Sequence, residues 1–360
     1  MQRNLPLRKG REHRERRQFG RFVKTLLAIT IAILGSHQAF SQGQPAAATS
    51  LHTATELVKL DVSVLDRRGK FVADLNPNQF HVLDNGTEQP VTFFEPVNAP
   101  AQILVMIETS PAVYLIHTEH LVAAYALFEG LAADDQVAIV AYSDKPRLAL
   151  GFTPDKDALL QAMNNLDYGI GMSQLNFYDS LTTAIGWLPA GTGKSAIVLL
   201  TTGLDSSTAS NWEMLVNKLR GSDLVIFPVA LGGYLRGANG KSTKSKRGGA
   251  NTRATEESEP SASSVAESFA KADEALRSLA MITGGHAYFP ASAGEFAAIY
   301  KEISAALRHE YVLGIAPAHD GQFHSLQVQV FEKAEENRKR REEQPGWRIF
   351  AREGYLAPSP

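Results

Sequence analysis

From residue 101 onward, short runs of apolar residues alternate with stretches of helical periodicity. The runs at 102–108 and 195–201 are almost continuously apolar, which predicts strands that are buried on both faces. Strands of this kind separated by helices are typical of a mostly parallel sheet. The predicted strands lie at 102–108, 136–142, 147–152, 195–201, 223–230 and 286–289. The predicted helices lie at 113–130, 155–166, 177–188, 211–221, 264–282 and 293–309. We therefore expect an α/β fold over 100–309: an open, mostly parallel six-stranded sheet with helices on both faces.

The residues that flank this region predict strands of another kind. Apolar and polar residues alternate over 57–64, which indicates a strand with one buried face. Short strands and turn residues continue through an N-terminal region at 55–98 and return in a C-terminal region at 310–357. We expect these flanking strands to form one small β unit. Residues 237–263 contain almost no apolar side chain, which predicts a flexible insertion in the α/β domain.

The first 41 residues have the pattern of a secretory signal peptide. Nine Lys or Arg and two Glu precede position 25, an apolar run fills 26–34, and small residues at Ala39 and Ser41 provide a cleavage site. The run is shorter than the roughly 20 residues of a membrane-spanning helix, so we expect cleavage and no membrane span in the mature chain. A linker at 42–54 follows. The expected location is extracytoplasmic, periplasmic or secreted, by the Sec or the twin-arginine route.

Loss of this leader changes the charge of the chain. The whole chain carries −2 and the leader carries +7, so the mature chain carries −9. A net-acidic surface repels phosphate backbones, which argues against nucleic acid and anionic membranes as general partners. The sequence contains no Cys, which excludes disulfides, thiolate metal sites and a lipidated Cys anchor.

Polar residues follow two of the apolar runs, at the edge of a parallel sheet where ligands bind. The segments 102–110 and 196–205 resemble the first and fourth strands of a von Willebrand factor A domain. The flanks, including the ending at 351–355, resemble secreted von Willebrand factor A-related proteins of acidobacteria, so the resemblance covers nearly all of the mature chain. It implies an interaction or adhesion module. In that family a metal-ion-dependent adhesion site is built from an Asp-x-Ser-x-Ser motif, a Thr in a later loop and an Asp after the fourth strand.

The positions that correspond to that metal site are mostly substituted here. They are Glu108, Ser110, Ala112, Leu175, Thr202 and Asp205. Glu108 stands at the first Asp, and Ala112 stands at the second Ser, where no side-chain oxygen remains. Thr202 replaces the second Asp, Leu175 replaces the Thr, and Asp205 matches a frequent acidic position that is not itself a ligand. Because Mg²⁺ requires near-octahedral oxygen ligands at about 2.0–2.1 Å, we predict a degenerate site that needs no metal cofactor.

Two interpretations of Glu108 remain open. Its carboxylate is either an acceptor for a Lys or Arg of a partner, or an edge carboxylate satisfied by neighbouring backbone N–H groups. A Mg²⁺- or Ca²⁺-dependent adhesion module that uses Glu108, Ser110 and Asp205 is the alternative to the metal-free site.

Other apparent motifs are weaker. Lys194 and Ser195 resemble the end of a phosphate-binding loop, but Leu188 stands where the loop needs Gly, and a strand follows instead of a helix. Asp155 and Asp179 stand at expected helix N-caps. The sequence has neither a Gly-x-Ser-x-Gly nor a His-Glu-x-x-His motif.

The sequence therefore predicts an exported, non-enzymatic interaction module. We expect it to bind a protein or cell-surface partner at the carboxyl edge of the sheet, without nucleic acid. A more remote alternative is an envelope hydrolase or nucleotide-using protein, supported only by Lys194 and Ser195.

Overall fold

A computed structural model describes residues 57–114, 117–169, 174–189, 194–206, 210–231, 233, 262–331 and 346–360. The expected signal peptide at 1–41 and linker at 42–54 lie outside the described residues, as does most of the expected insertion at 237–263. The predictions made for those segments stay predictions.

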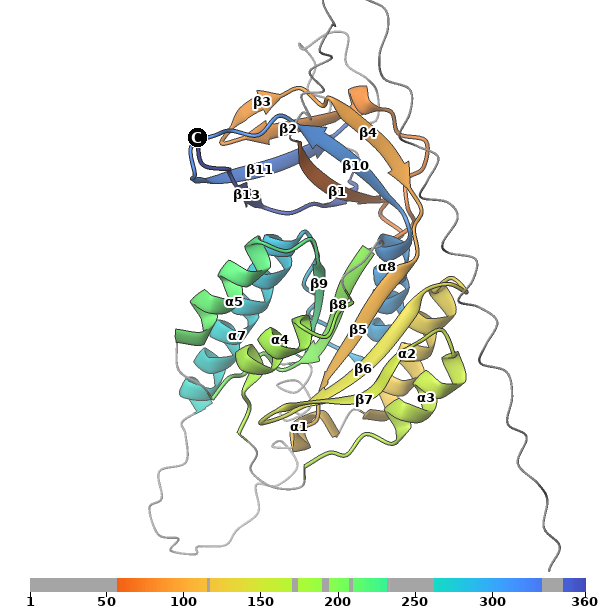
Figure 1. The fold of residues 1–360 in the computed structure, drawn as a ribbon. Coiled ribbons are helices and arrows are strands. Elements are labelled where there is room, and N and C mark those ends of the chain that lie inside the picture. The colour runs from red at the N-terminus through yellow and green to blue at the C-terminus, as the bar shows by residue number, and fades with distance from the viewer. Residues whose placement is uncertain are drawn as a thin grey trace, which may run out of the picture. The chain divides into compact units, whose positions relative to one another are not determined.

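The centre of the α/β region is an open sheet of five strands (Figure 1). The strands are β5 (Ala101–Glu108), β6 (Gln136–Tyr142), β7 (Pro146–Thr153), β8 (Lys194–Thr201) and β9 (Val225–Ala230). Their order is β7-β6-β5-β8-β9, and every pair is parallel except β6 with β7. The predicted α/β class with a mostly parallel sheet is confirmed.

The prediction of a sixth strand at 286–289 is wrong. This segment makes only an isolated parallel bridge, in which Tyr288 N donates to Pro228 O and Ala230 N donates to Tyr288 O, both at 2.8 Å. The next ladder bond toward the start of the segment would need an N–H at Pro228. The next one in the other direction would need an N–H at Pro290. Proline has no N–H, so the pairing stops at one bridge.

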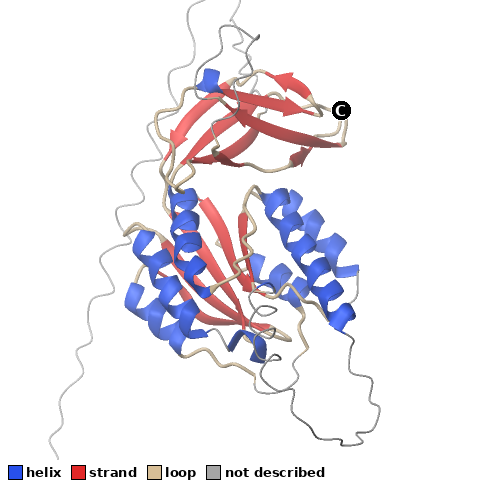
Figure 2. Ribbon diagram, turned by 180° about the vertical axis from the view of Figure 1, so that it is seen from behind, coloured by secondary structure: helices blue, strands red, loops and turns tan. Residues whose placement is uncertain are grey.

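Helices cover both faces of the sheet, as the sequence predicts (Figures 1 and 2). They are α1 (Pro111–Tyr114), α2 (His117–Gly130), α3 (Lys156–Asn164), α4 (Phe177–Ile185), α5 (Ser210–Arg220), α7 (Ala262–Thr283) and α8 (Phe296–Arg308), with short 3₁₀ turns η1 (Pro77–Gln79) and η3 (Ala293–Glu295). On β5, Ile103, Val105 and Ile107 pack with α2, α3 and α8, whereas Leu104 and Met106 pack with α4, α5 and α7. Both faces are therefore apolar, which explains the unbroken apolar runs.

One of the two predicted helix caps is observed. Asp155 precedes α3, and its Oδ1 accepts hydrogen bonds from Asp157 N and Ala158 N. The prediction for Asp179 is wrong, because this residue lies in the first turn of α4, after the N-cap residue Asn176. The carboxylate that binds the start of α4 comes from a different loop and is described below.

The flanking strands form two antiparallel sheets of four strands each, in the orders β12-β1-β10-β4 and β13-β11-β2-β3. The strands are β1 (Val58–Leu65), β2 (Phe80–Asp84), β3 (Thr87–Gln89), β4 (Phe93–Val97), β10 (Glu310–Ile315), β11 (Phe323–Val330), β12 (Arg348–Phe350) and β13 (Gly354–Leu356). Strand β1 pairs with β10, and β2 pairs with β11, so both ends of the chain build each sheet. The predicted small β unit is confirmed.

The alternation over 57–64 positions β1 as expected. Leu60, Val62 and Val64 are buried in the core of the β unit. Ser63 points to the other side, where its Oγ donates to the carbonyl oxygens of Ala306 and His309 at 2.8 and 2.9 Å. These bonds tie β1 to the carboxyl end of α8.

No helix in the described part of the chain is both long enough and apolar enough to cross a membrane.

Candidate functional site

The last residue of β5, Glu108, is fully buried at the carboxyl edge of the sheet. Its Oε1 accepts a hydrogen bond from Ser110 Oγ at 2.6 Å. Its Oε2 accepts bonds from Thr202 N at 2.7 Å, Thr202 Oγ1 at 2.8 Å and Thr201 Oγ1 at 3.1 Å. Tyr142 OH donates to the same oxygen at 3.4 Å. Five donors of the chain itself therefore hold this carboxylate, and we call this arrangement the Glu108 cluster.

Tyr142 and Gly203 extend the hydrogen bonds around the cluster. Thr201 Oγ1 accepts from Gly203 N at 2.8 Å and shares a hydrogen bond of 2.5 Å with Tyr142 OH. Burial raises the pKa of Tyr142 well above its usual value, and the charge of Glu108 raises it further. Tyr142 therefore keeps its hydroxyl hydrogen, within reach of both Thr201 Oγ1 and Glu108 Oε2.

These surroundings match the second interpretation of Glu108, in which its own neighbours satisfy it. Four of its five donors are hydroxyls rather than backbone N–H groups, which differs from the expectation. The full burial of Glu108 leaves no carboxylate oxygen exposed to a Lys or Arg of a partner.

The structure separates the other candidate residues into two groups. Ser110 and Thr202 join the Glu108 cluster, and both are buried. Ala112 lies in α1, although its side chain is outside the described residues, and Leu175 is a partly buried loop residue without a side-chain oxygen. Asp205 Oδ1 accepts a hydrogen bond at 2.8 Å from the backbone N–H of Phe177, the first residue of α4. A carboxylate at a helix start is stabilised by the free N–H groups and the helix dipole.

Direct hydrogen bonds also join the loops around the cluster. Ser206 N donates to Leu175 O at 2.6 Å, and Asn176 Nδ2 donates to Asp144 O at 2.9 Å. Gly169 N donates to Thr109 O at 3.1 Å. The loops that follow β5, β6 and β8 are thus each hydrogen-bonded to the segment that precedes α4.

A groove of about 570 Å³ lies at the same edge, between the loop after β8 and helices α4, α5 and α7. We call it the edge groove. Its lining includes Tyr178, Leu204, Asp205, Trp212, Lys271 and Glu274. The rings of Tyr178 and Trp212 contact each other with centroids 5.3 Å apart. The groove therefore combines an aromatic wall with charges of both signs on its rim.

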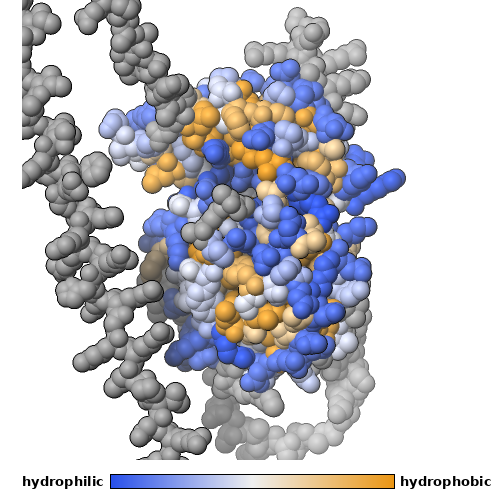
Figure 3. All heavy atoms as spheres, turned by 45° about the vertical axis from the view of Figure 1, so that its right-hand side comes forward, coloured by the Kyte–Doolittle hydropathy of each residue, from blue (hydrophilic) through white to orange (hydrophobic). Residues whose placement is uncertain are grey.

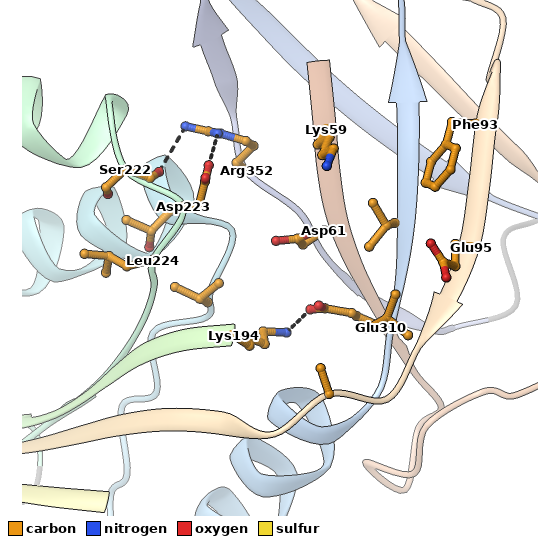
Figure 4. Close-up of a pocket in the computed structure, with 15 residues that line it drawn as sticks. Lys59, Asp61, Phe93, Glu95, Lys194, Ser222, Asp223, Leu224, Glu310 and Arg352 are labelled. Atoms are coloured by element: carbon orange, nitrogen blue, oxygen red, sulfur yellow. Dashed lines mark hydrogen bonds and ion pairs between the residues drawn. The ribbon is translucent and has the colours of Figure 1, made fainter. Parts of the chain in front are cut away.

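A second cavity, of about 340 Å³, lies at the opposite end of β8 (Figure 4). We call it the charged cavity. Lys194 Nζ pairs with Glu310 and donates to Ala306 O at 3.2 Å. Burial raises the pKa of Asp61 to about 6, and the nearby charge of Glu310 adds to the effect while Lys194 opposes it. The lysine of the apparent phosphate motif is therefore a buried partner of Glu310, at the amino edge of the sheet.

Sequence reasoning missed Tyr142 and Thr201. Tyr142 ends β6 directly opposite Glu108 in the register of β5 with β6. Aligning the two apolar runs end to end would have placed its hydroxyl near Glu108. Thr201 ends β8 and directly precedes Thr202, the residue at the substituted ligand position.

Comparison with known proteins finds a similarity to one class of domain. The family model of the von Willebrand factor type A domain matches residues 115–205, within the α/β region. The α/β region is therefore similar to a von Willebrand factor type A domain over these residues. No curated protein matches the chain.

Several solved structures are similar to parts of this chain at low identity. A von Willebrand factor type A protein from Catenulispora acidiphila is 11% identical, with a TM-score of 0.41, over 83% of this chain and 74% of that one. Proximal thread matrix protein 1 of the mussel byssus, solved with a zinc-occupied MIDAS motif, is 14% identical, with a TM-score of 0.42, over 61% of this chain and 49% of that one. BatB from Bacteroides thetaiotaomicron is 15% identical, with a TM-score of 0.35, over 57% of this chain and 97% of that one. This chain thus spans about half the length of the mussel protein.

Proposed function

We propose that this chain is an exported, non-enzymatic interaction module that binds a protein partner at the carboxyl edge of its sheet without an obligatory metal ion. The observation that carries the proposal is the Glu108 cluster. A divalent cation needs oxygen lone pairs and enough negative charge to replace its water shell. Here the hydroxyls of Ser110, Thr201 and Thr202 direct their hydrogens at Glu108.

The remaining donors at this edge do not fit the ion either. Asp205 uses Oδ1 to bind the start of α4, and Leu175 offers no side-chain oxygen. Among the described residues, no three His, Asp or Glu lie close enough together to hold a metal ion. The Mg²⁺-dependent alternative would require Glu108 to give up hydrogen bonds, because its Oε2 already accepts from Thr201 Oγ1, Thr202 N and Thr202 Oγ1.

The absence of enzymatic activity is supported by the burial of the reactive groups. Ser110 and Glu108 form a hydroxyl and carboxylate pair, but a substrate cannot reach two buried residues without opening the edge. Lys194 is held by Glu310, which disfavours the nucleotide alternative. The edge groove instead provides the aromatic and charged surface that protein partners use.

The test is capture of a partner on the immobilised chain from an envelope extract of the producing cells, with EDTA or with Mg²⁺. We expect the same partner in both buffers, because the edge is held by protein groups. The swap Lys271→Glu with Glu274→Lys reverses two exposed charges on the groove rim without changing the net charge, and should abolish capture. The swap Lys59→Glu with Glu129→Lys alters exposed residues of β1 and of the end of α2, away from the carboxyl edge, and should leave capture intact. Release of the partner by EDTA would contradict the metal-free proposal.

A further inference from the structure

A groove of about 700 Å³ lies away from the carboxyl edge, where the turn after β1 meets the ends of α2 and α8. We call it the basic groove. Four cationic residues line it: Arg68 and Lys70 from the turn, and Lys301 and Arg308 from α8. No Asp or Glu is among its lining residues. In a chain whose mature part carries −9, this is a local reversal of charge.

The nearest carboxylates, those of Asp66 and Glu302, already accept hydrogen bonds or form ion pairs within the chain. Asp66 Oδ1 accepts from Arg68 N at 2.8 Å and Lys70 N at 2.9 Å, and these bonds lower the pKa of Asp66. Glu302 is buried, accepts from Tyr288 OH at 3.0 Å and pairs with Arg348 at 2.6 Å. The charges of Arg68 and Lys70 also lower the pKa of Asp66, but neither carboxylate forms an ion pair with a cation of the groove among the described residues. Arg68, Lys70 and Lys301 make no ion pair within the described part of the chain.

The backbone of the turn and one of the four cations are held in place. Asp66 binds both N–H groups of the turn, and Gly69 takes a positive φ of 73° that closes it. Arg308 Nη2 donates to Gly130 O at 2.8 Å, which fixes the guanidinium at the end of α2. The turn and the Arg308 guanidinium therefore need little ordering when a ligand binds, which reduces the entropy lost on binding.

The floor of the groove is apolar. Phe71, Ala73 and Ala305 contribute to it, and the ring of Phe71 lies 5.0 Å from that of His309. Burial lowers the pKa of His309, and the charge of Arg308 lowers it further, so this ring is neutral near pH 7. The face of the molecule drawn in Figure 3 shows hydrophobic and hydrophilic areas side by side.

We propose that the basic groove binds an acidic peptide segment of a partner protein, with an apolar side chain on the floor and carboxylates against the cationic rim. The cations select negative charge. The apolar floor selects a peptide over a polysaccharide or nucleic acid, which would bring charge without an aliphatic side chain. This second surface is separate from the edge groove and does not depend on the function proposed for it.

The test is fluorescence anisotropy of the full chain with a labelled peptide of repeated Glu-Asp-Leu. We expect saturable binding that weakens when salt is added. Replacing the leucines of the peptide by serine should weaken binding roughly tenfold, as one buried aliphatic side chain contributes on this order. Dextran sulfate should compete weakly, because it lacks an apolar group.

The variant Lys70→Glu with Lys301→Glu reverses two exposed charges on opposite walls of the groove. We expect roughly tenfold or greater loss of peptide affinity, from the loss of two attractive charges and the gain of two repulsive ones. The control Lys145→Glu with Arg147→Glu makes the same change of net charge on exposed residues near β7 and should bind as the wild type does.

Three outcomes would overturn the proposal. The first is no binding of the leucine peptide, and the second is a groove variant that binds this peptide as tightly as the wild type does. The third is binding of the serine peptide and of dextran sulfate as tight as that of the leucine peptide. The last would indicate a general polyanion surface. Because the groove variant leaves the edge groove unchanged, partner capture at the edge should be the same as in the wild type, so the two proposals fail separately.

Discussion

Glu108→Ala is expected to lower the free energy of unfolding by about 3 kcal/mol, since a buried network would lose its common acceptor. Thr202 N and the hydroxyls of Ser110 and Thr202 would face a small cavity. Part of the cost is offset because a buried charge is removed. Urea unfolding followed by circular dichroism measures the change.

The matched control is Glu129→Ala, which removes an exposed carboxylate from α2 and should change stability by less than about 0.5 kcal/mol. Glu108→Gln preserves volume but replaces one acceptor with a donor, so it should fall between the other two variants. A Glu108→Ala variant as stable as the control would show that the cluster contributes little to the fold.

Asp61→Asn is expected to stabilise the protein at neutral pH by about 2 kcal/mol, an estimate taken from the shift of the Asp61 pKa from 3.8 to about 6 at about 1.4 kcal/mol per unit and reduced for partial exposure. The folded state holds a proton that the unfolded state releases between pH 4 and 6, so stability falls as pH rises through this window. Asparagine does not ionise and avoids this loss.

The charged groups that affect Asp61 are Glu310, Lys194, Asp223 and Arg352, while Lys59 and Glu95 also line the charged cavity. Thermal unfolding of wild type and variant from pH 3.5 to 8 measures the difference, which should vanish below about pH 4. Glu95→Gln is the control, because it changes an exposed carboxylate of the same cavity. Equal stability of Asp61→Asn and wild type at pH 7 would contradict the expected effect of burial.

The five central strands were predictable because each corresponds to a short run of apolar residues in the sequence. The prediction of a sixth strand was wrong because of Pro228, a residue of a different strand. Its missing N–H matters only once the two segments pair. The prediction of a helix cap at Asp179 was wrong for a similar reason. Asp205 takes the N–H of Phe177 from a distance of 28 residues along the chain. Effects that arise only after tertiary contact do not show in local periodicity.

The candidate site was likewise predictable from the sequence only in part. Its positions followed from the resemblance, but the hydrogen bonds around Glu108 also involve Tyr142, which comes from a neighbouring strand. The basic groove brings together Lys70 and Lys301, which lie far apart in the sequence and belong to no motif. The sequence pattern identified the domain, whereas the character of its surfaces required the fold.

The central claim is that the hydroxyls beside Glu108 bind its carboxylate in place of a metal ion. Isothermal titration of the full wild-type chain with Mn²⁺ tests it most directly. We predict no heat beyond dilution, and the same unfolding midpoint with Mn²⁺ as with EDTA. Stoichiometric Mn²⁺ binding that is lost in Ser110→Ala would contradict the account.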